Sequence, residues 1–150
     1  MKRNENILPL SREHHFGLLF CWKIRQALQK EVDTVRILPY IRYFLENHLL
    51  PHFHSEETIL FSKYEDELCQ QAIAEHAAIK DLADAILNGR NKSLQELSDL
   101  LDRHIRFEER VLFPHLEKSI PPEALKEIGM QLQELEKEQP KDHYPDEFWT

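Results

Sequence analysis

Apolar side chains recur every three or four residues along most of this chain, which is the spacing of one face of an α-helix. The pattern predicts four long helices, from Ser11 as N-cap to about Lys30, from about Thr34 to Tyr64, from about Glu67 to Leu87, and from Ser93 as N-cap to about Glu117. Pro51 and Pro114 lie inside the second and fourth segments. A proline lacks the N–H and its ring clashes with the preceding turn, so a kink is expected at each.

The C-terminal fifth of the chain breaks this pattern. A shorter fifth helix, Glu123 to about Glu138, is expected after the Pro121-Pro122 pair. Residues 139–150 are predicted to be a tail. Its apolar residues, Phe148 and Trp149, either dock on the helices or belong to a partly disordered end.

Length and composition suit one domain. The chain has 150 residues, 41% of them hydrophobic and only three of them glycine, which is enough for a sizeable helical core. We expect an all-α fold: an up-down-up-down four-helix bundle that includes the fifth helix over residues 1–138, followed by the tail over residues 139–150.

Charge and cysteine content narrow the function. A formal net charge of −8 disfavours nucleic acid and anionic membranes as partners, and the sequence indicates no particular protein partner. Cys21 and Cys69 form neither a disulfide framework nor a C-x-x-C motif. With no targeting segment and no long apolar run visible, a cytoplasmic protein with reduced thiols is expected.

One motif, H-x-x-x-E-E-x-x-L-F, occurs twice, at residues 52–61 and 104–113, offset by 52 residues. Residues four apart lie on one face of a helix, about 6 Å apart along its axis. Each copy therefore presents an imidazole beside a carboxylate, His52 with Glu56 and His104 with Glu108. Two such helices facing each other would bring two histidines and two glutamates to one point.

Both pairs lie on the apolar stripes of their helices, which for the fourth helix includes Leu101, Leu112 and Val111. Burying an unpaired carboxylate costs several kcal/mol, so a partner is required. The partner is either a metal ion or, in each helix, the neighbouring histidine alone. Two pairs at one offset favour the metal.

The other two long helices offer further imidazoles. His76 shares an apolar stripe with Ala72 and Ile73, where a plain core histidine is the alternative. The first helix offers the neighbours His14 and His15, of which His14 shares the apolar face and is favoured. The candidate metal ligands are thus His14 or His15, His52, Glu56, His76, His104 and Glu108.

Four imidazoles and two carboxylates are too many donors for one tetrahedral zinc ion. They suit two ions, with both glutamates bridging and two histidines on each ion. Mixed nitrogen and oxygen ligation with open positions favours iron, with zinc or manganese as possible substitutes. Glu57 and Glu109, beside the two bridging candidates, are expected to be solvated or to orient a histidine.

These residues resemble the hemerythrin-like (HHE cation-binding) domains over about Ser11 to Glu117. The motifs that carry the resemblance are Glu13-His14-His15, His52-x-x-x-Glu56, Glu75-His76 and His104-x-x-x-Glu108-Glu109. The resemblance implies a four-helix bundle around a non-haem di-iron centre, oxo- or hydroxo-bridged. It places His14 and His52 on one iron, His76 and His104 on the other, and Glu56 and Glu108 between them.

The chain departs from the oxygen-carrying hemerythrins on the third helix. Those proteins place a second histidine one turn from the first, whereas here Ala72 and Lys80 flank His76. Both irons could then keep an open position. His48, one turn before His52, could replace a missing ligand or support one, and the alternative is a plain buried histidine.

The expected function is the binding or sensing of O2 or a related small oxidant, without dedicated catalytic residues. Two alternatives stay open. One is a di-iron redox enzyme that handles NO or peroxide or repairs iron centres. The other is a structural or binding module stapled by zinc.

Overall fold

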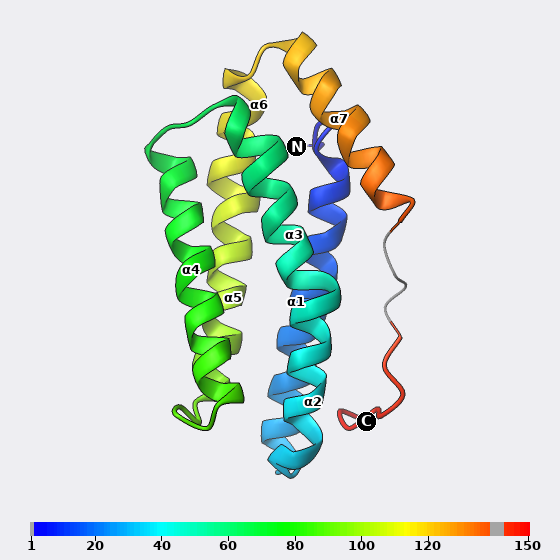
Figure 1. The fold of residues 1–150 in the computed structure, drawn as a ribbon, viewed down its shortest axis with the longest axis vertical. Coiled ribbons are helices and arrows are strands. Elements are labelled where there is room, and N and C mark those ends of the chain that lie inside the picture. The colour runs from blue at the N-terminus through cyan, green and yellow to red at the C-terminus, as the bar shows by residue number, and fades with distance from the viewer. Residues whose placement is uncertain (1, 139–142) are drawn as a thin grey trace.

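The computed structural model describes residues 2–138 and 143–150, and over this part of the chain it contains helices and no strands. The elements before α7 (Pro122–Glu136) form four long helical rods. In Figure 1 these rods lie side by side, and α7 lies against their upper end. The first rod is α1 (Leu8–Gln29) and the third is α4 (Glu67–Leu87). No helix among the described residues is long and apolar enough to cross a membrane.

The second and fourth rods are interrupted helices. The second, residues 34–63, consists of α2 (Thr34–Phe44), the π-helical turn η1 (Leu45–Leu49), α3 (Leu50–Ser55), the π-helical turn η2 (Glu56–Leu60) and the 3₁₀ turn η3 (Phe61–Lys63). The fourth, residues 94–119, consists of α5 (Leu94–Phe107), the π-helical turn η4 (Glu108–Leu112) and α6 (Phe113–Ser119). Both rods therefore match the predicted helices in extent but not in regularity.

The first helix begins earlier than predicted. It starts at Leu8, and Ser11 is a residue of its first turn rather than its N-cap. Pro9 suits a first turn because the N–H that it lacks would have no helical partner there. Ile7 and Leu10 are buried in the apolar cluster at the upper end of the bundle, and this burial stabilises the added turn.

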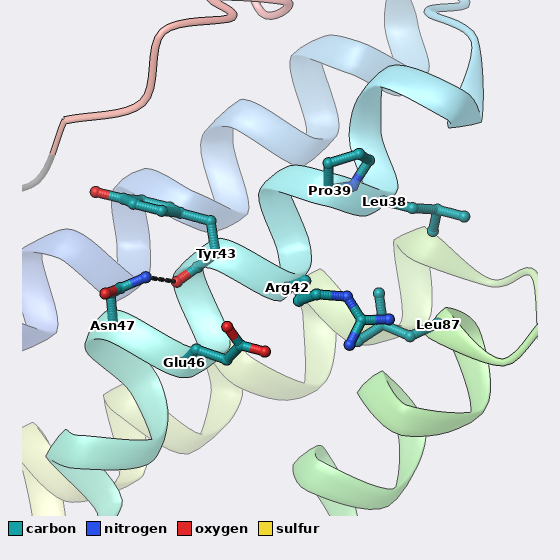
Figure 2. Close-up of a pocket in the computed structure, with 7 residues that line it drawn as sticks. All are labelled: Leu38, Pro39, Arg42, Tyr43, Glu46, Asn47 and Leu87. Carbon is teal, nitrogen blue, oxygen red and sulfur yellow. Dashed lines mark hydrogen bonds between the residues drawn. The ribbon is translucent and has the colours of Figure 1, made fainter.

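The kinks expected at Pro51 and Pro114 take the form of π-helical turns. In each case the wide turn ends two residues before the proline, and the N–H of the residue that follows the turn donates five residues back, as Leu50 N–H does to the carbonyl of Leu45. The wide turn relieves the clash between the proline ring and the turn before it. A hydrogen bond from the Asn47 side chain links η1 to α2: Nδ2 donates to the Tyr43 carbonyl at 2.9 Å (Figure 2).

The π-helical turn at Glu108 also shifts the face that the following residues present. Val111, predicted on the buried stripe, is 46% exposed, whereas Leu112 and Phe113 are fully buried. A wide turn inserts an additional residue into the helical repeat, so that a stripe extrapolated at 3.6 residues per turn loses phase there.

The core has two apolar clusters. One, toward the lower end of Figure 1, joins α1, α2, α4 and α5 around Phe20 and Tyr40. The other, toward the upper end, joins the start of α1 to α6 and α7 around Phe113. Six buried polar residues, named here the polar layer, come from the middle of the rods: His14, His52, Glu56, His76, His104 and Glu108.

The described end of the tail, residues 143–150, docks on the lower cluster, which is the first of the two alternatives expected for Phe148 and Trp149. Phe148 is buried, with its ring 5.2 Å from that of Tyr40, and the ammonium of Lys23 lies 3.9 Å from the ring centre of Trp149. Asp146 forms an ion pair with Arg36 at 2.6 Å. The predicted boundary between domain and tail adjoins residues 139–142, which lie outside the described residues, and it stays a prediction.

Candidate metal centre

The polar layer brings four imidazoles and two carboxylates together from all four rods. Each of the six residues is at most 5% exposed, and Glu56 and Glu108 are fully buried. Their donor atoms form two sets in which all atoms lie within 4.8 Å of one another. The two sets have both glutamates in common and are completed by different histidines: His14 and His52 in one, His76 and His104 in the other.

The inward-facing atoms are the Nε2 atoms of the imidazoles and the oxygens of the two glutamates. His52 Nε2 lies 3.3 Å and His76 Nε2 3.1 Å from Glu56 Oε1, while His104 Nε2 lies 3.2 Å from Glu108 Oε2. His14 Nε2 is 2.8 Å from Glu108 Oε1. The two glutamates thus stand between the two pairs of imidazoles.

Most of these atoms lack a hydrogen bond among the described residues. The unpartnered atoms are His52 Nε2, His76 Nε2, His104 Nε2, both carboxylate oxygens of Glu56, and Glu108 Oε2. His14 Nε2 and Glu108 Oε1 form a hydrogen bond, whereas the other three contacts are close enough for ion pairs but do not have hydrogen-bond geometry. A buried polar atom without a partner costs about 1–3 kcal/mol, and more when charged. Bound cations would satisfy all of these atoms at once, so the residues fit a pair of metal ions.

Each imidazole is held from behind by its own glutamate. The Nδ1 atoms of His14, His52, His76 and His104 lie 2.6–2.7 Å from carboxylate oxygens of Glu109, Glu13, Glu57 and Glu75, respectively. These four glutamates, named here the outer carboxylates, keep side-chain exposures of 17–31%. An Nδ1–H that donates to a carboxylate leaves Nε2 as the lone-pair atom, which is the arrangement that a metal-binding histidine needs.

The doubled motif encodes most of this arrangement. Its histidine and its first glutamate face the shared point, and its second glutamate holds the imidazole of a neighbouring rod: Glu57 holds His76, and Glu109 holds His14. Its final phenylalanine stacks on that same imidazole, with ring centres 6.1 Å apart for Phe61 on His76 and 5.3 Å apart for Phe113 on His14. Of the two alternatives predicted for Glu57 and Glu109, the second, that they orient a histidine, is confirmed.

Sequence reasoning missed the same role for Glu13 and Glu75. Each stands directly before a histidine of the polar layer, but holds a different one: Glu13 holds His52 and Glu75 holds His104. A signal was available, because the Glu-His dipeptides at 13–14 and 75–76 repeat at one offset of 62 residues. The structure therefore has two similar halves, α1 with the second rod and α4 with the fourth.

Both shared glutamates begin a π-helical turn, Glu56 in η2 and Glu108 in η4. Wide turns of this kind are rare within helices and are found frequently at functional sites. The turn in η4 precedes Pro114, whereas Ser62 occupies the matching position after η2. The turn at Glu56 therefore has no local proline to explain it.

Within the polar layer, attraction between imidazolium and carboxylate groups offsets the cost of burying their charges. Burial lowers the pKa of His52, but the charge of Glu56 and the hydrogen bond to Glu13 outweigh it and raise the pKa to about 9. The pKa of His104 is likewise raised to about 9, by Glu108 and Glu75 against burial. Burial raises the pKa of Glu56, but His52 and the other imidazoles bring it well below its usual range. Without metal, protonated imidazoles thus stabilise the buried carboxylates.

Two further histidines that the sequence offered lie outside both sets. His15 is exposed, and its ring contacts that of Phe16. His48 lies half-buried beside Phe16, with Nε2 3.5 Å from the Tyr43 hydroxyl. Of the neighbours His14 and His15, the structure brings only His14 into the polar layer. The thiols of Cys21 and Cys69 are free and buried, and burial raises the pKa of each to about 12.

A surface pocket of about 510 Å³ lies along α2 and η1, and Leu87 of α4 also lines it (Figure 2). Its polar lining residues are Arg42, Tyr43, Glu46 and Asn47. None of the polar layer or outer carboxylates lines it, so this pocket is separate from the candidate centre.

The family model of the hemerythrin HHE cation-binding domain matches residues 10–116, which include the whole polar layer and all four outer carboxylates. No curated protein and no solved structure gives a significant match. The segment before residue 10 and the helix α7 lie outside the matched range.

Proposed function

The chain belongs to the hemerythrin HHE cation-binding domain family, and from that premise we propose that it holds a non-haem di-iron centre that binds or senses O2 or a related small oxidant. The observation that carries the proposal is the pair of donor sets that share Glu56 and Glu108. A structural zinc site needs four ligands around one ion, whereas these six residues offer two ions a common pair of carboxylates.

The six residues have distinct roles in this proposal. The Nε2 atoms of His14 and His52 would hold one ion and those of His76 and His104 the other, with Glu56 and Glu108 shared. The outer carboxylates would keep each imidazole oriented and increase its basicity. Two iron ions would supply reversible electron exchange with a small oxidant.

Room for that oxidant comes from a missing ligand. Two imidazoles and two carboxylate oxygens per ion are fewer than the six donors of octahedral iron. Ala72, one turn before His76, is fully buried and offers only a methyl group. We infer that each ion keeps a position for an exogenous ligand, and that the up-down-up-down bundle serves to hold the two sets in register.

The surroundings would exclude bulk water from that position. Phe53 stacks on His76 with ring centres 3.8 Å apart, and Phe113 stacks on His14. With an apolar cluster toward either end of the bundle, small uncharged molecules would reach the centre more readily than ions. O2 and NO are small uncharged molecules of this kind. A cytoplasmic location of the protein stays a prediction.

A second function is favoured by the equal ligand count of the two donor sets. If both ions keep an open position, the protein could turn over NO or peroxide rather than bind a ligand reversibly. Steady consumption of either substrate by the iron-loaded protein, in the presence of a reductant, would favour this enzyme over a sensor.

The test of the main proposal is metal content per chain together with the optical spectrum of the same aerobic sample. About two irons per chain, with the near-ultraviolet and visible absorption of a bridged diferric pair, are expected. A spectrum that changes reversibly when O2 is removed and restored would support binding or sensing. One zinc per chain, or no uptake of iron by the metal-free protein, would overturn the di-iron proposal.

A further inference from the structure

The N-terminal segment reaches one of the outer carboxylates. Arg3, outside the family match, lies against the fourth rod with only 17% of its side chain exposed. Its Nη1 donates to Glu117 Oε1 at 2.6 Å, and its Nη2 donates to the main-chain oxygen of Glu109 at 2.7 Å. The same Nη2 lies 3.4 Å from Glu109 Oε1. The guanidinium therefore holds both the backbone and the side chain of Glu109.

The main-chain contact fills a gap that the fold itself creates. In the π-helical turn η4, Phe113 N–H donates to the Glu108 carbonyl, five residues back, instead of to that of Glu109. The next donor along the chain is absent because residue 114 is proline. The Glu109 carbonyl is left without its usual helical partner, and Arg3 supplies one.

The side-chain contact continues to the polar layer. Glu109 Oε2 accepts a hydrogen bond from Ser11 Oγ at 2.7 Å and lies 2.7 Å from His14 Nδ1. His14 Nε2 in turn faces Glu108 at 2.8 Å. Arg3 and Ser11 thus brace the carboxylate that sets the orientation of one imidazole.

Glu57, the outer carboxylate that corresponds to Glu109 in the other half, has no such support among the described residues. Glu57 holds His76 at 2.6 Å, and His76 is its only side-chain hydrogen-bond partner among the described residues. In α4, which matches α1 at an offset of 62 residues, the position of Ser11 is taken by Ile73, which has no hydroxyl to donate. In the second rod, which matches the fourth at an offset of 52 residues, the position of Pro114 is taken by Ser62, which keeps its N–H. The two halves resemble each other in ligands but differ in what supports them.

Building on the proposed function, we propose that Arg3 is a positioning residue for the metal position of His14 and His52. This position then depends on the N-terminal segment, whereas the position of His76 and His104 does not. The two metal ions would consequently bind with different affinities although their ligands are alike.

The test is a titration of the metal-free chain with Co²⁺ alone, followed by absorption spectroscopy and equilibrium dialysis. Loss of an outer-sphere partner of a metal ligand typically lowers affinity 10–100-fold. We expect Arg3→Met to lower the affinity for one of the two Co²⁺ ions by about tenfold, the low end of that range, and to leave the affinity for the other unchanged. Arg12→Met removes the same charge from an exposed arginine, paired with Glu136 at 3.6 Å, and should change neither affinity.

Double variants assign the weakened position. The effect of Arg3→Met should largely disappear when Glu109→Gln is already present, and should persist in full beside Glu57→Gln, because coupling is confined to residues of one network. Ser11→Ala removes the second brace and should weaken the same ion by a smaller factor. It serves as the test variant if circular dichroism shows that Arg3→Met has lost helix.

Two outcomes would overturn the proposal. Equal weakening of both ions would mean that Arg3 supports the fold in general, and an unchanged pair of affinities would mean that the brace has no effect on the metal. A wild-type chain that takes up no pair of ions would overturn the proposed function as well. The two failures are therefore distinguishable.

Discussion

Two pairs of adjacent glutamates, Glu56-Glu57 and Glu108-Glu109, show how one residue type takes two roles. The first member of each pair is fully buried and belongs to both donor sets. The second keeps about 30% of its side chain exposed and holds a single imidazole. A carboxylate that both ions share should matter to both, whereas an outer carboxylate should matter to one.

The largest effect should come from the shared carboxylates. Glu56→Ala or Glu108→Ala should abolish binding of a metal pair, because each would remove a charged group that the proposal assigns to both ions. Metal content per chain after iron reconstitution measures this. If both variants kept two irons per chain, the bridging assignment would be wrong.

An outer carboxylate should have a smaller and one-sided effect. Glu57→Gln should lower the affinity of one ion by about 10–100-fold, because His76 loses the acceptor that orients it, while the other ion stays near its wild-type affinity. Titration with Co²⁺ resolves the two steps. Equal loss at both steps would remove the distinction between shared and outer carboxylates.

Removal of the metal should reveal the charges that it replaces. A glutamate with a lowered pKa, such as Glu56, stabilises the metal-free fold above about pH 4.5, and this stabilisation is lost as the pH falls. A histidine with a raised pKa, such as His52 or His104, stabilises the fold below about pH 6.5, and this stabilisation is lost as the pH rises toward 9. The metal-free protein should therefore become less stable between pH 6.5 and 9. The loaded protein should not, because metal binding favours neutral imidazoles.

Thermal melting of both forms at pH 6 and pH 9 checks this expectation. The metal-free protein should melt at a lower temperature at pH 9 than at pH 6, and the difference between the loaded and metal-free forms should widen with pH. A metal-free protein with the same melting temperature at both values would show that its imidazoles are not protonated near neutral pH.

The smallest effect should come from the neighbour of a proposed ligand. His15→Ala should leave metal content unchanged and stability within about 0.5 kcal/mol, because the side chain is exposed. His14→Ala, one residue away, should cost one ion. Elemental analysis of the two variants side by side measures the contrast. A loss of metal in His15→Ala would return that residue to the ligand set.

Local geometry made several features predictable from the sequence. A helix places residues four apart on one face whatever surrounds it, so the His52–Glu56 and His104–Glu108 pairs followed from spacing alone. The disturbances at Pro51 and Pro114 followed in the same way, since a proline lacks its N–H in any context. The extent of the four long helices depended on the same short-range information.

Contacts between rods were decided only by the tertiary structure. The pairing of Glu13 with His52 and of Glu75 with His104 depends on how whole rods are rotated and shifted against one another, as does the π-helical turn at Glu56. The apolar stripe of the first helix already favoured His14 over His15, and the packing of the rods brings His14 alone into the polar layer. The bond from Arg3 to Glu109 joins residues 106 positions apart. Such relations arise from the packing of the two apolar clusters as a whole, because burying those clusters sets the position of every rod, and no short stretch of sequence contains that information.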